Sequence, residues 1–187
     1  MEILSKNDII DNQNIIDEII AGKIFIYPTD TIYGIGCNAL ISESVHKIRT
    51  LKQRPDNPFS VIAPSKGWIT KNFDLNSEYL DKLPGKYTYV MKPKTQVVTK
   101  ITNPKTKMLG VRIPDNWFTK IIQKAGVPFI TTSVNITNMP NMTYFENLNQ
   151  SIKSGVDYLI DEGEIKGSAS KVIMFDGEDI LELRWGI

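Results

Sequence analysis

The sequence predicts an α/β fold in one domain, with a twisted mixed sheet flanked by helices. Apolar runs of strand length alternate with amphipathic stretches along the whole chain, without a repeat or a low-complexity linker. The 187 residues, 41% of them hydrophobic, suffice for one buried core but not for two full-sized domains. The run Tyr87 to Met91 alternates little, which is typical of a strand buried on both faces. Residues 1–187 are therefore expected to form a single domain.

The expected helices follow from apolar residues at helical spacing and from residues that begin or stop a helix. Gly22 and Gly126 are expected to end two helices, and Ser42 and Asp115 are expected to cap two. The predicted helices are Asp8 to Ala21, one that begins at Ser42 and carries Val45, Ile48 and Leu51, Ser77 to Leu83, one from Asp115 to Gly126, and one from Thr143 to Ser154 with a Thr143–Glu146 capping box.

The expected strands are short apolar runs between turn signals. The last two are predicted to pair across the turn DGED, and the polar, proline-bearing stretch Lys92 to Lys107 is predicted to be a mobile loop over a site. The predicted strands are Ile24 to Tyr27, Phe59 to Ala63, Tyr87 to Met91, Leu109 to Ile113, Pro128 to Thr132, Val156 to Ile160, Lys171 to Phe175 and Ile180 to Arg184.

Composition excludes several classes of protein. With 22 Lys and Arg against 21 Asp and Glu, the formal net charge is +1, which provides no large basic field for nucleic acid. One cysteine and one histidine exclude an intrachain disulfide and a Cys/His zinc set. A P-loop, a GxGxxG fingerprint and a serine nucleophile elbow are lacking. Neither a signal peptide nor a run of membrane-spanning length is found, so a cytoplasmic protein without a membrane segment is expected.

The stretch IYPTDTIYGIG places two threonines and an aspartate between an apolar strand and a glycine-rich turn. Two interpretations remain open. Thr29, Asp30 and Thr31 can simply form the turn, because short polar side chains bond to local backbone. Alternatively, they lie at the carboxyl end of a central strand, where open α/β sheets bind their ligands.

Four other polar clusters lie at the ends of predicted elements. In LKQRPDNP, Lys52 and Arg54 can complement a helix C-terminus or, on a segment stiffened by prolines, bind a polyanion such as a triphosphate. Ser133 and Asn135 in TTSVN follow a strand. Arg112 lies in an otherwise apolar strand and therefore needs a protein carboxylate or an anionic ligand. GSASK opens a strand, and LRW, with Arg184, closes its partner.

These clusters resemble the YrdC/Sua5 family of threonylcarbamoyl-adenylate synthases. The similar segments are PTDTIYGIG with CNAL, KQRPDNP, GVRIP, TTSVN with PNMT, and GSASK with LRWG, in the family's order from about Gly22 to Gly186. The resemblance implies a YrdC-like fold with a concave substrate-binding face, in the short form without a further C-terminal domain. It also implies synthesis of threonylcarbamoyl-AMP and pyrophosphate from L-threonine, bicarbonate and ATP, for the threonylcarbamoyladenosine (t6A) modification of tRNA.

The resemblance also implies roles for individual residues. Mg²⁺ is expected on the ATP phosphates, without protein ligands. The partners implied are the downstream tRNA threonylcarbamoyl-transferase machinery, and weak tRNA binding is left open. The residues implied are Lys52, Arg54, Ser133 and Asn135 for catalysis, these four with Asn57, Thr143 and Arg184 for ATP, and Thr31, Arg112 and Ser170 for threonine. Because Lys52 and Arg54 are expected in an exposed loop, their replacement by alanine is expected to reduce turnover far more than stability.

Three departures from the family pattern bear on this interpretation. Val134 stands where alanine is usual, Thr137-Asn138 where a serine-glycine pair is usual, and Lys171 where threonine is usual. They indicate either sequence drift in the shell around the site or a change in the substrate amino acid. Two further functions stay open for the same fold: a carbamoyl-adenylate-forming domain of the kind used in hydrogenase maturation, and a non-catalytic RNA- or nucleotide-binding protein.

Overall fold

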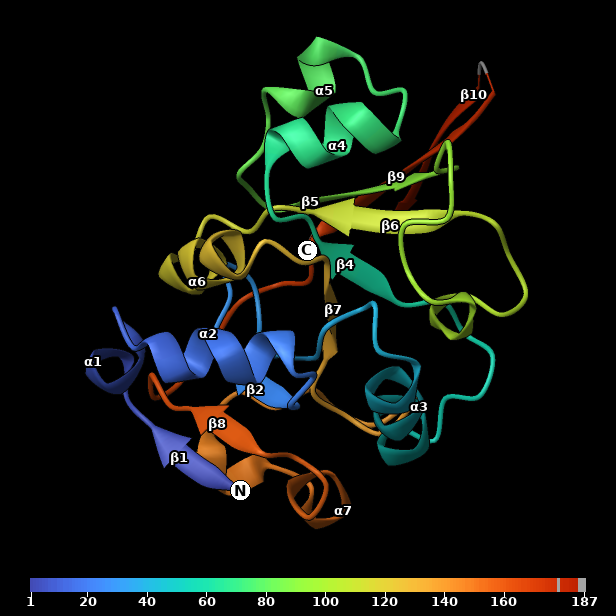
Figure 1. Ribbon diagram of the computed structural model, residues 1–187. Coiled ribbons are helices and arrows are strands. Elements are labelled where there is room, and N and C mark those ends of the chain that lie inside the picture. Colours follow the sequence, from blue (N-terminus) through green and yellow to red (C-terminus); the bar gives the residue numbers. More distant parts are fainter. Residues whose placement is uncertain (178, 185–187) are drawn as a thin grey trace.

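Strand β7 (Phe129–Ser133) joins the two halves of the sheet. It pairs antiparallel with β3 (Gly34–Gly36) on one edge and with β4 (Ser60–Ile62) on the other. In the computed structural model, which describes residues 1–177 and 179–184, the strands form one 10-stranded sheet in the order β1-β8-β2-β3-β7-β4-β6-β5-β9-β10 (Figure 1). The predicted α/β class is therefore confirmed.

The half of the sheet on the β3 side begins with β1 (Glu2–Leu4) at the edge. β1 pairs parallel with β8 (Tyr158–Ile160), which pairs parallel with β2 (Phe25–Tyr27). β2 then pairs antiparallel with β3. Parallel and antiparallel pairs thus occur in the same half, so the predicted mixed sheet is confirmed.

The half on the β4 side contains the remaining strands. β6 (Leu109–Arg112) runs parallel to β4, and β5 (Tyr87–Met91) runs antiparallel to β6. β9 (Lys171–Asp176) pairs parallel with β5, and β10 (Asp179–Arg184) pairs antiparallel with β9 at the opposite edge from β1 (Figure 1). The predicted C-terminal hairpin is therefore present.

Side chains alternate between two cores, one on each face of the sheet. Phe25 and Tyr27 of β2 belong to one core and Ile26 to the other. Helices α2 (Gln13–Ile20) and α6 (Trp117–Ala125) pack together on the first core, each through an isoleucine-rich face. This arrangement sandwiches the strands between helical layers.

The second core is covered in part by α3 (Ser42–Leu51), whose Val45 and Ile48 are fully buried. The other helical segments are α1 (Lys6–Ile9), α4 (Lys66–Asn72), α5 (Ser77–Leu80), η1 (Lys100–Thr102), η2 (Phe145–Asn147) and α7 (Gln150–Lys153).

The predicted helix over Asp8 to Ala21 is wrong in its first turns. Asp11 adopts a left-handed φ of 63°, which ends α1, and α2 begins afresh after Asn12. The Asn12 side chain accepts a hydrogen bond from the Asn14 backbone amide and so caps α2. The apolar residues on both sides of this break have helical spacing, so the sequence pattern predicted a single helix.

Three predicted caps are also wrong. Ser42 lies inside α3, one residue after the N-cap position, and Asn116 rather than Asp115 caps α6. The predicted helix from Thr143 to Ser154 is divided into η2 and α7, and Asn149 caps α7. At α6 the asparagine next to the predicted cap takes its place, because its side chain accepts a hydrogen bond from an exposed amide of the first turn.

Four elements were not predicted: β1, β3, α4 and η1. The glycines of β3 indicated a turn, but the strand fits between β2 and β7 because Gly34 and Gly36 carry no side chains. A Cβ on Gly36 would lie 1.8 Å from the Ile130 carbonyl oxygen. Close backbone approach therefore explains a glycine-rich strand.

The segment Lys92 to Lys107 does not cover the polar cavity described below. It contains η1, and Val97, Val98 and Ile101 pack against the core. None of the described residues lining that cavity comes from this segment, so the prediction of a loop over the site is wrong. Within residues 1–177 and 179–184, no helix has the length and apolar character that crossing a membrane requires.

Replacing Gly36 by alanine is expected to destabilise the fold by at least about 2 kcal/mol, because the Ile130 carbonyl cannot move without breaking the β3–β7 pairing. Urea unfolding measures this loss. Gly67→Ala in α4 is the control: its Cβ meets only Ser65 Oγ at 3.6 Å, so it should leave stability unchanged or raise it slightly. Equal effects of the two variants would contradict the steric explanation.

Candidate functional site

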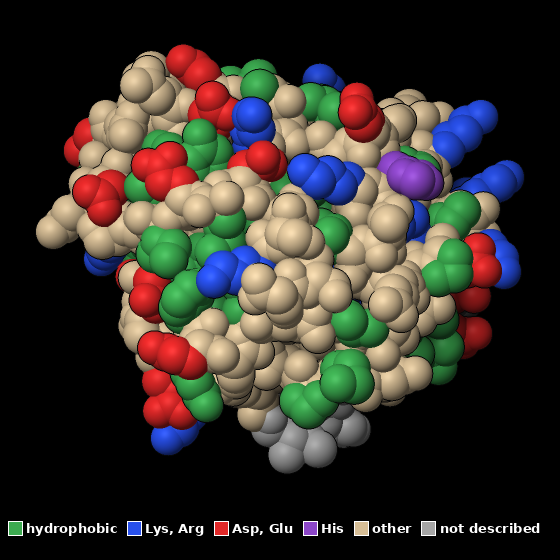
Figure 2. Space-filling view, turned by 90° about the horizontal axis from the view of Figure 1, so that it is seen from below, with side chains coloured by type: hydrophobic (Ala, Val, Ile, Leu, Met, Phe, Trp, Pro, Cys, Tyr) green, Lys and Arg blue, Asp and Glu red, His purple; other side chains and the backbone are tan. Residues whose placement is uncertain are grey.

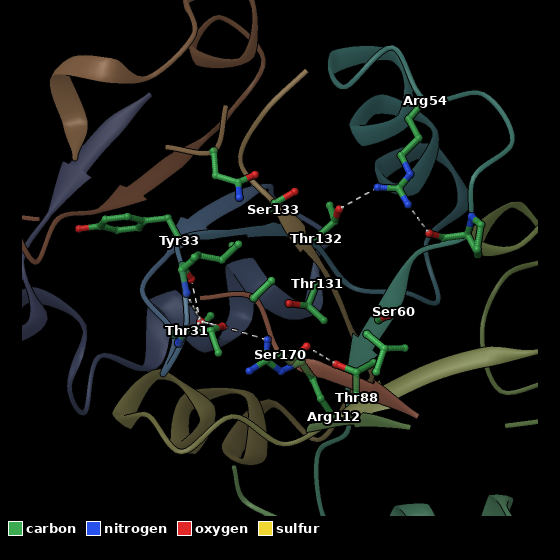
Figure 3. Close-up of a pocket in the computed structure, with 17 residues that line it drawn as sticks. Thr31, Tyr33, Arg54, Ser60, Thr88, Arg112, Thr131, Thr132, Ser133 and Ser170 are labelled. Carbon is green, nitrogen blue, oxygen red and sulfur yellow. Dashed lines mark hydrogen bonds between the residues drawn. The ribbon is translucent and has the colours of Figure 1, made fainter. Parts of the chain in front are cut away.

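A cavity of about 230 Å³ opens where β7, β4, β5 and β6 meet the turn after β2. Its lining is dominated by hydroxyl side chains and two arginines (Figure 3). Figure 3 shows Arg112 at one end, beside Thr31 and Ser170, and Arg54 at the other. The two ends of this cavity are called here the Arg112 end and the Arg54 end.

Arg112, at the C-terminus of β6, is buried and paired with Asp30. Its Nη2 lies 2.6 Å from Asp30 Oδ1, and its Nη1 donates to Thr31 Oγ1 at 3.3 Å. Asp30 Oδ2 also accepts the Asp115 backbone amide at 3.0 Å. The carboxylate that the sequence required for Arg112 is therefore present in the chain, and it fixes the guanidinium in place.

The PTDT stretch forms the predicted turn and also contributes to the cavity lining, and ligand binding there stays a prediction. Thr29 forms the turn: its Oγ1 donates to the Ile32 carbonyl at 2.7 Å and accepts the backbone amides of Thr31 and Ile32. Thr31 is 1% exposed and lines the cavity. The turn former thus holds the pocket residue in position.

Ser170 lies on the floor of the Arg112 end. Its hydroxyl is 2.7 Å from that of Thr88 on β5, and both side chains are buried. Gly167 brings the preceding segment against Thr31, since a Cβ there would lie 1.6 Å from the Thr31 carbonyl oxygen. Residues far apart in sequence are therefore gathered at this end.

Lys52 is buried beneath the end of β7, so its expected place in an exposed loop is wrong. The side chain is 1% exposed, and Nζ donates to the carbonyl oxygens of Ser133 and Asn135 at 2.5 and 2.8 Å and to Asn135 Oδ1 at 3.1 Å. Ser133 Oγ in turn donates to Asn135 Oδ1 at 2.6 Å. Lys52 therefore does not line the cavity; it fixes the chain that carries Ser133, which does.

Burial lowers the pKa of Lys52 to about 7, and nearby Arg54 adds to this effect. The three oxygen acceptors favour the charged form and keep the ammonium satisfied when it is protonated. Burial therefore makes the Lys52 ammonium easier to deprotonate than an exposed lysine, while its three hydrogen bonds act in the opposite direction.

Arg54 reaches the opposite end of the cavity from the loop after α3. It is half-buried, and its Nη2 donates to the Pro58 carbonyl at 3.0 Å while Nη1 lies 3.5 Å from Thr132 Oγ1. Burial lowers the pKa of Arg54, which remains a strong cation. The Arg54 end therefore presents a guanidinium beside the β7 hydroxyls.

The arrangement of this cavity can be set beside known proteins. The Sua5/YciO/YrdC family model, described as "Telomere recombination", matches residues 17–186. The chain belongs to the Sua5/YciO/YrdC family.

Relatives within the Sua5/YciO/YrdC family differ in length. A Methanocaldococcus jannaschii protein named putative threonylcarbamoyl-AMP synthase is 36% identical over 177 residues, covering 91% of this chain and 83% of the relative. The Pyrococcus abyssi threonylcarbamoyl-AMP synthase is 32% identical over 160 residues, covering 81% of this chain. The chain spans only 47% of that relative's length.

Two solved structures from the family share the fold. P. abyssi Sua5 complexed with L-threonine has a TM-score of 0.84 at 25% identity, and the match covers 98% of this chain and 56% of that one. Escherichia coli YciO has a TM-score of 0.82 at 21% identity, covering 100% of this chain and 95% of the other, which shows the fold alone.

The residues expected to bind ATP are only partly brought together. Arg54 and Ser133 line the cavity, and Asn135 lies directly behind Ser133. Asn57 is exposed and Thr143 accepts a hydrogen bond from Asn147, and neither is part of the lining. The side chain of Arg184, at the end of β10, lies outside the described part of the chain.

The departures from the family pattern are accommodated locally. Asn138 adopts a φ of 69°, the conformation a glycine would supply and one that asparagine tolerates. The hydroxyl and amide of Thr137 donate to the Lys52 carbonyl, and Val134 is buried in the core. Lys171 pairs with Glu182 of β10 at 2.5 Å and is not part of the cavity lining.

Several lining residues escaped the sequence analysis. Thr88 and Ser60 lie in strands, where a hydroxyl gives no local signal of a site. Tyr33 follows the PTDT stretch closely; its hydroxyl donates to the Gly163 carbonyl at 2.8 Å, and burial raises its pKa to about 12. The position of Tyr33 beside PTDT was the one available clue.

Lys52 is expected to make stability rise with pH above neutral. Its folded pKa of about 7 lies below its ordinary 10.5, so folding releases a proton between these values. The free energy of unfolding should increase through this window by at most about 1.4 kcal/mol per pH unit, and below pH 7 the folded protein should bear the full cost of burying the ammonium. Urea unfolding at several pH values measures the slope, and Lys52→Met removes this titration. Identical slopes in both proteins would contradict the assignment.

Removing Asp30 is expected to cost more than removing an exposed acid. Asp30→Ala leaves the buried Arg112 guanidinium without its carboxylate, and the expected loss is about 3 kcal/mol in the free energy of unfolding. Glu78→Ala, which breaks the exposed pair with Lys82, is the control and should cost less than about 1 kcal/mol. Chemical denaturation compares them. Similar losses would show that Asp30 is not required to hold Arg112.

Proposed function

We propose that the chain is an L-threonylcarbamoyladenylate synthase, which makes threonylcarbamoyl-AMP and pyrophosphate from L-threonine, bicarbonate and ATP. The observation that carries the proposal is one cavity with a fixed arginine at each end and hydroxyls between them. Named synthases among the relatives, and a Sua5 structure containing L-threonine, support it. The product would serve the t6A modification of tRNA and pass to a tRNA threonylcarbamoyl-transferase.

The Arg112 end suits the amino-acid substrate. A guanidinium that Asp30 holds at the cavity wall can attract a carboxylate, and Thr31 and Ser170 offer hydroxyls beside it. Such a small polar site can distinguish threonine from an amino acid without a hydroxyl, because unpaired buried polar groups are costly.

The Arg54 end suits the triphosphate. Arg54 supplies a forked cation, and the Ser133 hydroxyl lies on the strand end that Lys52 holds. MgATP is the expected substrate, with Mg²⁺ held by the phosphates. In the described part of the chain, no group of three or more His, Cys, Asp or Glu side chains that could bind a metal occurs.

The reaction needs positioning and charge neutralisation. The threonine amine combines with bicarbonate to give a carbamate and water, and a carbamate oxygen attacks the α-phosphorus while the bond to pyrophosphate breaks. A loosely bonded phosphoryl transition state is stabilised mainly by cations and donors already in place. Arg54 and Ser133 fit this role, Asn135 would hold Ser133 in place, and Arg112 would keep threonine oriented toward the phosphate.

The charge distribution on the surface gives less support to a non-catalytic RNA-binding protein. On the face drawn in Figure 2, Lys and Arg side chains are interspersed with Asp and Glu. A surface of mixed sign holds phosphate backbones weakly. A contact of tRNA with this face is therefore expected to be weak and secondary to the small-molecule reaction.

Pyrophosphate release from MgATP tests the proposal directly. Release is expected to require both L-threonine and bicarbonate, and serine, run in place of threonine, is expected to support it more weakly. Release with another amino acid instead of threonine would indicate a changed substrate. No release with any amino acid, while MgATP still binds, would favour a non-catalytic nucleotide-binding protein.

Arg112→Lys is expected to raise the KM for threonine by about tenfold to a hundredfold, because lysine cannot pair with Asp30 and a carboxylate through one planar fork. The KM for ATP should change little. Initial-rate kinetics over both substrates measure the two constants. Lys124→Met, which removes an exposed cation on α6, serves as control and should behave as wild type. A larger increase in the KM for ATP than in the KM for threonine would indicate that ATP binds at the Arg112 end and threonine at the Arg54 end.

A further inference from the structure

Arg49 on α3 is a buried cation that is held by backbone oxygens. Its side chain is 5% exposed, and among the described residues it forms no ion pair. Instead, its guanidinium donates to five backbone carbonyl oxygens. Burying a charge in this way costs free energy unless hydrogen bonds compensate for the lost water.

One group of these carbonyls belongs to the loop that carries Arg54. Arg49 Nη1 donates to the carbonyl oxygens of Arg54, Pro55 and Asn57 at 2.8, 3.2 and 3.0 Å. In return, the Arg54 backbone amide donates to the Arg49 carbonyl at 3.0 Å. The guanidinium therefore closes the loop from Arg54 to Asn57 around itself.

The other carbonyls belong to η1. Arg49 Nε and Nη2 donate to the carbonyl oxygens of Ile101 and Thr102 at 2.7 and 2.6 Å. The Phe59 ring lies 4.4 Å from the Arg49 guanidinium and 5.5 Å from that of Arg54. Arg49 thus ties the Arg54 loop to a separate segment that packs on the core.

The same loop contains backbone strain immediately before Arg54. Gln53 adopts a φ of 49°, a left-handed conformation that costs a residue with a side chain about 1 kcal/mol. Such a conformation persists only where the surroundings hold it. The carbonyl contacts of Arg49 begin at the next residue and supply that hold.

We propose that Arg49 is a positioning residue that holds the Arg54 side chain in place at the Arg54 end of the cavity. This inference rests on the proposed function, because it assumes that Arg54 meets the ATP phosphates. Five N–H donors in a rigid fork suit a guanidinium to several carbonyls at once, and a lysine ammonium offers only three. Arg49 itself does not line the cavity.

Arg49→Lys tests the proposal, with MgATP binding measured by calorimetry at a temperature where every variant is folded. The variant keeps the charge but loses the fork. The Kd for MgATP is expected to rise about tenfold, the change that the loss of one charge-assisted hydrogen bond produces, while the KM for threonine stays within twofold. Lys47→Met removes an exposed cation from the same helix and should leave both constants unchanged.

A double-mutant cycle separates positioning from general destabilisation. If Arg49 acts through Arg54, Arg49→Lys should weaken MgATP binding by less than about twofold when Arg54 is already methionine. Additive effects of Arg49→Lys and Arg54→Met would overturn the proposal, as would an unchanged Kd in Arg49→Lys. Failure of the wild-type protein to bind MgATP would instead overturn the proposed function.

Discussion

The buried cations around the cavity are held by oxygen acceptors, and the shape of the site depends on this constraint. Lys52 binds the end of β7, Arg49 binds the Arg54 loop, and Arg112 binds Asp30. Ammonium and guanidinium groups cannot be buried without such partners. Each of the three therefore holds a backbone or carboxylate segment in place, and those segments carry residues that line the cavity.

β7 contributes the residues that line the middle of the cavity. Because it pairs with β3 and with β4, its polar end lies at the middle of the sheet, between the turn after β2 and the loop after α3. Ligands of open α/β sheets commonly bind at such strand ends. The hydroxyls from Thr131 to Ser133 thus connect the Arg112 end to the Arg54 end.

The elements that could be predicted are those set by residues close together in the sequence. Apolar strands and the helix ended by Gly126 follow from spacing and from a left-handed glycine, and both are present. β3 was missed because Gly36 is required by the close approach of the Ile130 carbonyl, which is distant in the sequence. The break at Asp11 was missed because apolar spacing continues across it. Arg49 drew no attention, since a cation in a helix normally faces solvent.

The sequence alone determined the α/β class, the family resemblance and many of the polar residues that line the cavity, because these depend on residue types in order along the chain. Only the tertiary structure decided which of those residues face a ligand and which support the ones that do. Lys52 is the clearest instance: its spacing from Arg54 indicated a pair, yet burial directs its ammonium to the β7 carbonyls while Arg54 turns to the cavity. The physical reason is that exposure and hydrogen-bond partners are set by segments far away in the sequence.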